Sequence, residues 1–173
     1  MMRVMAWIGV TLLAVSPAVM AQDAGLLAFP GAEGFGRYAK GGRGGAVLFV
    51  TNLSDYRPGE EVIPGSLRAA VEAEGARTVV FRVSGTIELK GTLSIREPYI
   101  TVAGQTAPGD GICVRNYGVS VQTHDVIVRH IRCRPGDEVG RLPEYAERGW
   151  STDALSLSGA ARDVILDHCS TSW

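Results

Sequence analysis

The chain has 173 residues, a length that suits about one domain. Its 17 lysine and arginine residues face 18 aspartate and glutamate residues, a near-neutral balance that argues against binding to nucleic acid or a membrane surface. Apolar residues make up 46% of the sequence, enough for a core, and the 22 glycines indicate many turns rather than long helices. Stretches rich in valine, isoleucine and threonine favour an all-β fold.

The first 21 residues have the pattern of a secretory signal peptide. A start with one arginine precedes an apolar run of 12 residues, Val4 to Val15, and Val19-Met20-Ala21 follows as a cleavage signal. The alternative is a membrane anchor, but 12 apolar residues are too few to cross a bilayer. We therefore predict cleavage after Ala21, a mature domain over 22–173, and a secreted or periplasmic protein.

Three cysteines lie in the mature chain, at Cys113, Cys133 and Cys169. An odd number in an exported protein leaves at least one thiol unpaired. Their spacing matches no zinc motif, and buried free cysteines behave as small apolar residues. We expect three free thiols.

The mature chain begins with a glycine-rich, loop-like stretch over 22–45. The apolar run Ala46–Thr51 predicts a strand. After a polar loop, Ser66 can cap a short helix that runs to Glu74, and Gly75 can end it. This is the only helix that the pattern predicts in the mature chain.

Short apolar runs separated by turn residues then continue to the end of the chain. No helix long enough to cross between sheets interrupts them. The expected strands are Thr78–Val83, Thr86–Ile95, Tyr99–Ala103, Gly111–Arg115, Val119–Val121, Asp125–Cys133, Ala154–Leu157 and Asp163–Cys169.

A six-residue segment repeats within these strands. The sequence DVIVRH at 125–130 returns as DVILDH at 163–168, with four identical positions and an offset of 38 residues. Other neighbouring units recur every 20 to 27 residues, and an insertion from about Asp137 to Trp150 explains the longer offset. A period of this size indicates stacked units that share one core.

Stacking of the two copies predicts specific contacts. His130 should lie over His168, and Arg129 should lie beside Asp167, because neighbouring strands are about 4.8 Å apart. Alternation points four residues into the core, namely Val126, Val128, Val164 and Leu166. The predicted architecture is a right-handed parallel β-helix, capped at its start by the 66–74 helix. A β-sandwich is the alternative, but hairpin turns of the Asn-Gly or Asp-Gly kind are almost absent.

Six motifs occur along the chain in the order FPGAEGFGRYAKGGRGG, VTNLSD, PGSLRAAVEAEGARTVVFRVSGTI, YITVAGQTAPGDGICV, DVIVRHIRCRPGDE and DALSLSGAARDVILDHCSTSW. In this order they resemble the amino-terminal part of the bacterial pectate lyase family, whose fold is a right-handed parallel β-helix. The resemblance implies a secreted enzyme that cleaves polygalacturonate by β-elimination, with calcium as cofactor.

The resemblance assigns Asp153 to a calcium-ligand aspartate of the family. The family often has a second acid two residues earlier, where this chain has Ser151. Asp153 as a simple turn cap is the alternative. Asp167 and His168 match the family's Asp-His signature, and we expect both to be structural.

Other charged residues are weaker site candidates. Asp137 and Glu138 are acids on a loop, where such residues are usually just solvated. Arg132 and Arg134 could line a groove for an anionic polymer. The resemblance places the remaining calcium ligands and a catalytic arginine beyond Trp173, so we expect an incomplete chain that is inactive alone.

Two other functions stay open. A polygalacturonase-like hydrolase would need paired carboxylates, and no Asp-Asp pair lies on an expected strand. A non-enzymatic β-helix, such as a surface adhesin, is the second alternative, because a fold does not determine a function. For the pectate lyase we expect a monomer that binds pectate (polygalacturonate) and neither nucleic acid nor a membrane.

Overall fold

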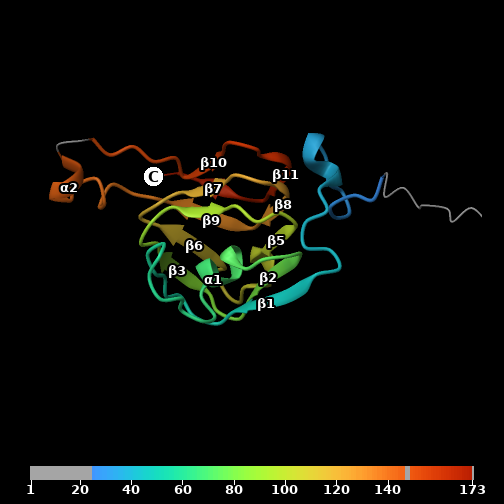
Figure 1. The fold of residues 1–173 in the computed structure, drawn as a ribbon, viewed down its shortest axis with the longest axis horizontal. Helices are drawn as coiled ribbons and strands as arrows, with labels where there is room; N and C mark the ends of the chain where they lie inside the picture. The colour runs from blue at the N-terminus through green and yellow to red at the C-terminus, as the bar shows by residue number, and fades with distance from the viewer. Residues whose placement is uncertain (1–24, 147–148, 173) are drawn as a thin grey trace, which may run out of the picture.

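The computed structural model describes residues 25–146 and 149–172, and its strands form three parallel sheets (Figure 1). Residues 1–21, where the signal peptide is predicted, lie outside the described residues. Sheet A contains, in spatial order, β1 (Ala46–Val50), β2 (Arg77–Phe81), β5 (Ile100–Ala103), β8 (His124–Arg129) and β11 (Arg162–Asp167). Sheet B contains β12 (Ser170–Thr171), β9 (Ile131–Arg134), β6 (Ile112–Arg115) and β3 (Gly85–Glu88). Sheet C contains β10 (Leu155–Leu157), β7 (Val119–Val121) and β4 (Leu93–Ile95).

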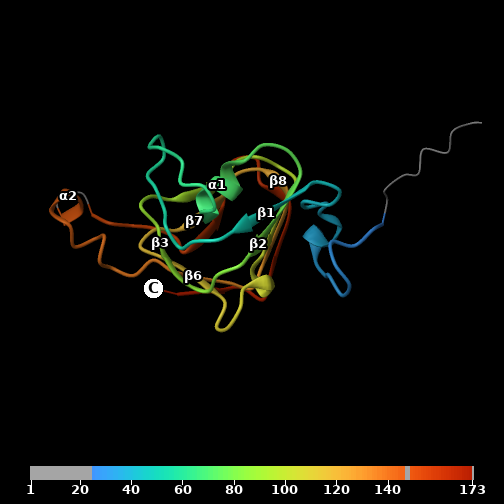
Figure 2. The ribbon, with the colours of Figure 1, turned by 90° about the horizontal axis from the view of Figure 1, so that it is seen from below.

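From β2 onward the chain visits sheets A, B and C in the same order in every coil. Figure 2 looks along the stack, so that successive coils overlap in the view. Val79, Val102, Val128 and Leu166 occupy one column of sheet A, so successive coils are 23, 26 and 38 residues apart. The parallel β-helix predicted from the repeat is therefore confirmed. The extra residues of the last interval lie within 137–150, and Figure 1 shows α2 (Pro143–Ala146), in the described part of this segment, projecting from the body.

The repeated segments stack as predicted. β8 and β11 are parallel neighbours, with Val126 opposite Val164 and Arg129 opposite Asp167. Arg129 Nε donates to Asp167 Oδ2 at 2.6 Å. The His130 and His168 rings lie 4.7 Å apart between centroids and are only 11° from parallel.

Two of the expected strands are each divided by a corner of the coil. The run Thr86–Ile95 forms β3 and β4, and the run Asp125–Cys133 forms β8 and β9. At the second corner His130 adopts a φ of 54°. Apolar periodicity continues through such a corner because both flanking strands point side chains into the same core, so periodicity alone does not show where the chain bends.

The helices also differ in part from expectation. The predicted helix is α1 (Leu67–Glu72), and Ser66 caps it by accepting a hydrogen bond from the Ala69 amide at 3.2 Å. It ends two residues earlier than predicted. The pattern did not predict the three short helices over Phe35–Tyr38, Gly104–Thr106 and Pro143–Ala146, since each has at most four residues and too few turns for a period.

α1 closes the first coils of the stack. It packs against β1, β2 and β4, and in Figure 2 it lies within the outline of the coils. Leu67, Ala70 and Val71 are its buried apolar residues. They join a core in which the inward residues of all three sheets meet, including Val79, Ile87, Ile95, Val102, Val114, Val121, Val126 and Val128.

The glycine-rich segment 28–45 covers part of the outer face of sheet A. Ala32 and Ala39 pack there against Ile127 and Ile165, which point away from the main core. The backbone comes so close that a Cβ on Gly36 would lie 2.0 Å from the Val164 carbonyl oxygen. A residue without a side chain is required at this crossing.

The cysteines give a direct test of the coil register. Cys133 is opposite Thr171, two residues beyond Cys169, and all three cysteines are free. We expect titration of the unfolded, unreduced protein with a thiol reagent to find three reactive groups. Burial, with smaller contributions from Cys169 and Cys113, raises the pKa of Cys133 to about 12, so this thiol should react slowly before unfolding. A count of one would show a disulfide and contradict the register.

Candidate functional site

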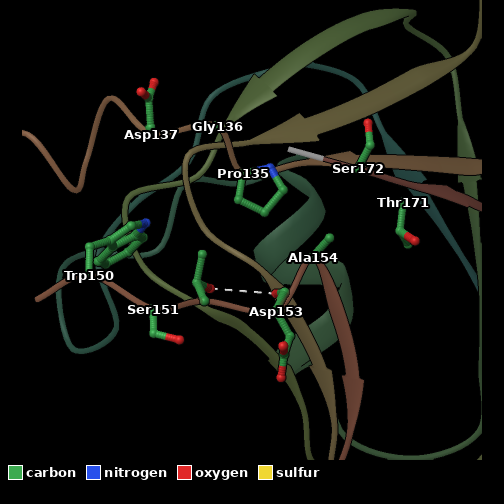
Figure 3. Close-up of a pocket in the computed structure, with 10 residues that line it drawn as sticks. Pro135, Gly136, Asp137, Trp150, Ser151, Asp153, Ala154, Thr171 and Ser172 are labelled. Carbon is green, nitrogen blue, oxygen red and sulfur yellow. Dashed lines mark hydrogen bonds between the residues drawn. The ribbon is translucent and has the colours of Figure 1, made fainter.

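Asp153 lies two residues before β10, between the 137–150 insertion and that strand. Its side chain is exposed on the wall of a cavity of about 490 Å³ (Figure 3). The cavity is lined by Pro135, Gly136, Asp137, Trp150, Ser151, Thr152, Asp153, Ala154, Thr171 and Ser172. The lining thus includes residues from both ends of the insertion, together with Thr171 and Ser172 at the end of β12.

The preceding coil holds the Asp153 backbone in place. The Val119 amide donates to the Ala154 carbonyl at 3.1 Å, and Leu155 is opposite Val119 in sheet C. A Cβ on Gly118 would lie only 1.9 Å from the Asp153 carbonyl oxygen. The absence of a side chain at Gly118 therefore permits the close approach that positions Asp153.

The acidic residues of the insertion have partners of their own. Asp137 Oδ2 accepts a hydrogen bond from Arg141 at 2.5 Å, and Glu138 pairs with Arg115 at 2.8 Å. Figure 3 shows the Asp137 and Asp153 carboxylates pointing away from one another. Among the described residues, no side-chain hydrogen bond or ion pair engages the Asp153 carboxylate. The structure does not bring Asp137 and Asp153 together as a ligand pair.

The polar side chains nearest Asp153 in the lining carry oxygen atoms. Ser151, Thr152, Thr171 and Ser172 line the same cavity as Asp153, and each has a hydroxyl group. Calcium binds six to eight oxygen ligands, chiefly carboxylates, carbonyl oxygens and water. The oxygen atoms of these residues are therefore of the kind that binds a hard cation such as calcium. The cavity has two carboxylates, and that of Asp153 is not paired with arginine.

Trp150 fixes the end of the insertion beside this cavity. Its ring makes edge contacts with Tyr117 at 5.3 Å and with Tyr145 at 4.9 Å. Burial, followed by a hydrogen bond with Tyr145, raises the pKa of Tyr117 to about 12. The three rings join the insertion to the loop between β6 and β7, which also contains Gly118.

The predicted groove arginines lie elsewhere. Arg134 donates to the Ser170 carbonyl and to Ser170 Oγ, both at 2.8 Å, so its guanidinium connects β9 to β12. Arg132 is exposed and lines a second cavity, together with His130 and His168. Neither arginine lines the cavity of Asp153, and their role with substrate stays a prediction.

Asp167 and His168 form a connected group at the corner between sheets A and B. Asp167 Oδ2 accepts from Arg129 Nε and lies 2.9 Å from His168 Nδ1. Burial raises the pKa of Asp167, but hydrogen bonds from His168 and Arg129 outweigh burial and hold it below its ordinary value. The Arg129–Asp167 contact joins neighbouring coils, and the structural role of Asp167 and His168 stays a prediction.

Sequence reasoning named Asp153 but missed other residues of its cavity. Thr171 and Ser172 are far from Asp153 in sequence, and only the stacking of β12 on β9 brings them to the wall. Trp150 was noted only as the end of the insertion. The one available signal was the repeat itself, because it implies that residues after His168 follow the same path as those after His130.

Several known proteins with related sequences are named as probable pectate lyases. A protein of Emericella nidulans named "Probable pectate lyase C" is 46% identical over 166 residues, which cover 94% of this chain and 34% of the relative. A protein of the same name from Aspergillus fumigatus is 44% identical over 99% of this chain and 36% of its own length. An Arabidopsis thaliana protein named "Probable pectate lyase 12" is 34% identical over 80% of this chain. The chain thus spans about a third of the length of the curated relatives it matches. No protein-family model matches it.

A solved structure agrees with the fold. The crystal structure of Jun a 1, the major allergen from cedar pollen, superposes with a TM-score of 0.51 and 28% sequence identity. The superposition covers 59% of this chain and 30% of the allergen. The relatives named above are fungal and plant proteins, so they give no support to the bacterial part of the resemblance. The chain folds as a parallel β-helix, and its sequence is similar over nearly its whole length to proteins of the pectate lyase family.

Proposed function

We propose that this chain is part of a secreted pectate lyase that cleaves polygalacturonate by calcium-assisted β-elimination. The observation that carries the proposal is the identity of about 45% to pectate lyases over 94–99% of the chain. The continuous parallel β-helix and the oxygen-lined cavity of Asp153 support it. The chain spans only about a third of those relatives, so the activity belongs to the intact enzyme.

The chemistry defines what Asp153 would do. β-Elimination removes the C5 proton next to the uronate carboxylate and expels the 4-O-glycosidic oxygen, so negative charge builds up on that carboxylate. Calcium, when bound, would neutralise this charge as a Lewis acid. Asp153 would hold the ion, with hydroxyl oxygens of Ser151 and Thr152 as neighbouring donors. The close approach of Gly118 would fix the Asp153 backbone, and no salt bridge to the Asp153 carboxylate would have to break before the ion binds.

The base that takes the C5 proton is proposed to be an arginine outside this chain. Arg134, the arginine nearest in sequence to the cavity wall, is engaged with Ser170. Export would follow from the signal peptide predicted over 1–21. Among the described residues no helix has the length and apolar character to cross a bilayer.

A hydrolase is the second candidate, and the cavity disfavours it. An inverting hydrolase places two carboxylates about 6.5–9.5 Å apart, with a water between one of them and the sugar. Asp137, the second acid of the cavity, is paired with Arg141 and points away from Asp153. A non-enzymatic adhesin is distinguished by activity alone: elimination yields an unsaturated uronide that absorbs in the ultraviolet, hydrolysis yields none, and an adhesin yields no product.

The proposal is tested by Asp153→Asn in an intact enzyme that contains this chain. The substitution keeps the side-chain shape and removes one ligand charge, so the calcium concentration for half-maximal elimination should rise roughly tenfold, because calcium affinity follows ligand charge. Saturating calcium should restore part of the activity by mass action. The measurement is the rate of unsaturated-product formation over a calcium titration.

Asp137→Asn is the matched control. It removes a carboxylate from the same cavity wall, but one that already pairs with Arg141, so the calcium dependence should stay unchanged. Equal calcium dependence in wild type and Asp153→Asn would show that Asp153 is only a turn residue. Hydrolytic products without an unsaturated end would reject the lyase assignment itself.

A further inference from the structure

Two of the three histidines of the chain form a stacked pair away from the Asp153 cavity. His130 and His168 occupy the same corner of neighbouring coils and have left-handed φ values of 54° and 52°. This backbone conformation is uncommon for residues other than glycine. The coil stack thus holds two imidazoles one above the other on a rigid frame.

A carboxylate completes a group of possible metal ligands at this corner. One ring nitrogen of His130, one of His168 and one oxygen of Asp167 all lie within 4.8 Å of one another. His168 Nδ1 lies 2.9 Å from Asp167 Oδ2. Two ligands bound at about 2.0–2.1 Å in a tetrahedral zinc site are separated by about 3.3 Å, so this nitrogen and oxygen would need to move apart by only about 0.4 Å to hold one ion.

The ring proton between His168 Nδ1 and Asp167 can move to the other nitrogen of the same imidazole. A carboxylate only accepts hydrogen bonds, so in the metal-free protein His168 Nδ1 carries the ring proton and donates it. The His168 side chain is 66% exposed. Its Nε2 can therefore carry the proton toward water, and this second neutral tautomer leaves the Nδ1 lone pair free for a metal.

The corner also has space for an ion. Both histidines line a cavity of about 370 Å³, together with Asp110 and Arg132. The exposed His168 ring can tilt from the stacked position to bring its nitrogen nearer to that of His130. Two cations oppose binding: Arg129, which donates to Asp167 and lies over the Phe29 ring at 3.8 Å, and the exposed Arg132. Their repulsion favours a moderate affinity over a tight one.

We propose that His130, His168 and Asp167 form a binding site for a divalent transition metal of the zinc or copper class. Imidazole nitrogen with one carboxylate suits these ions, whereas calcium prefers oxygen ligands alone. The site is separate from the Asp153 cavity, since the two cavities share no lining residue. A bound ion bridges β8–β9 to β11–β12 and stabilises the folded chain by mass action.

The test is calorimetric titration of the chain, without an oligohistidine tag, with zinc chloride and with copper chloride. We expect one equivalent to bind with micromolar affinity and the melting temperature to rise. Electron paramagnetic resonance of the copper-loaded protein should show hyperfine coupling to two nitrogen nuclei. Millimolar calcium should not displace either ion.

Variants separate this site from adventitious binding. His130→Ala and His168→Ala should each weaken binding at least tenfold, as should His168→Gln, which keeps a polar side chain at the left-handed corner. His124→Ala is the control, because the third histidine pairs with Asp125 and lies edge-on to Tyr99, and it should bind as the parent does. Unchanged affinity in the His130 and His168 variants, loss in the His124 variant, or no binding at millimolar metal would overturn the proposal.

Discussion

Replacing Arg77 with methionine should lower the free energy of unfolding by about 3–5 kcal/mol, one of the two largest effects expected in this chain. Arg77 is the first residue of β2, and its side chain is fully buried. Burial lowers the pKa of its guanidinium, and Glu97 opposes that shift. An arginine in proteins nevertheless keeps its charge, so its hydrogen bonds must replace the water it loses.

Backbone carbonyl groups provide those bonds. The guanidinium donates to the Ala70 and Val71 carbonyls at 3.2 and 2.5 Å, and so satisfies the last turn of α1. It also donates to the carbonyls of Gly75, Glu97 and Pro98 at 2.9, 3.3 and 3.1 Å. Methionine has a similar length but no donor, so these carbonyls lose their partner. Each buried polar group without a partner costs about 1–3 kcal/mol.

Chemical unfolding of the chain, followed by circular dichroism, measures the effect. Arg82→Met is the matched control, because Arg82 is exposed and its guanidinium lies 4.5 Å above the Phe49 ring. A surface contact of this kind contributes about 0.5–1 kcal/mol. Similar losses in the two variants would show that the carbonyl groups around Arg77 find other partners and that α1 does not depend on it.

Arg77 also shows what the sequence could not predict. The coil register was predictable because each coil must place apolar residues in the same core column, which produced the repeat at Asp125 and Asp163. An arginine at the start of a strand has no such signal. It reads as a surface residue, since charged residues are seldom buried unless paired. Its burial follows from the path of α1, which only the assembled fold determines.

The candidate site likewise has a part that the sequence could predict and a part that it could not. Asp153 was predictable from the motif that contains it, and the insertion was predictable from the longer repeat interval. The hydroxyls of Thr171 and Ser172 were not, because their place on the cavity wall depends on where the insertion leaves and rejoins the stack. The polar character of a residue does not indicate which of several loops it will face.

Replacing Asp55 with asparagine should likewise cost about 3–5 kcal/mol, the usual result of removing one partner of a buried ion pair. Both side chains of the Asp55–Arg68 pair are 1% exposed. Asp55 Oδ1 accepts from Arg68 Nε at 2.8 Å, and Oδ2 accepts from Arg68 Nη2 at 2.9 Å. Oδ2 also accepts from the Lys90 amide at 2.8 Å. The pair therefore joins the loop after β1, helix α1 and the turn before β4.

Asparagine presents an NH2 group where Asp55 has an oxygen, so one donor faces another and the buried Arg68 charge loses its buried counter-ion, with only the partly exposed Glu72 carboxylate nearby. Glu72→Gln is the control: Glu72 also neighbours Arg68, but at 3.7 Å and with its side chain 40% exposed, and such a pair contributes at most about 1 kcal/mol. The double variant Asp55→Asn/Arg68→Met tests the cause. If the uncompensated charge is responsible, the double variant should unfold at a higher urea concentration than Asp55→Asn alone. If it unfolds at a lower one, Arg68 contributes mainly through its bonds to the Gly91 and Thr92 carbonyls.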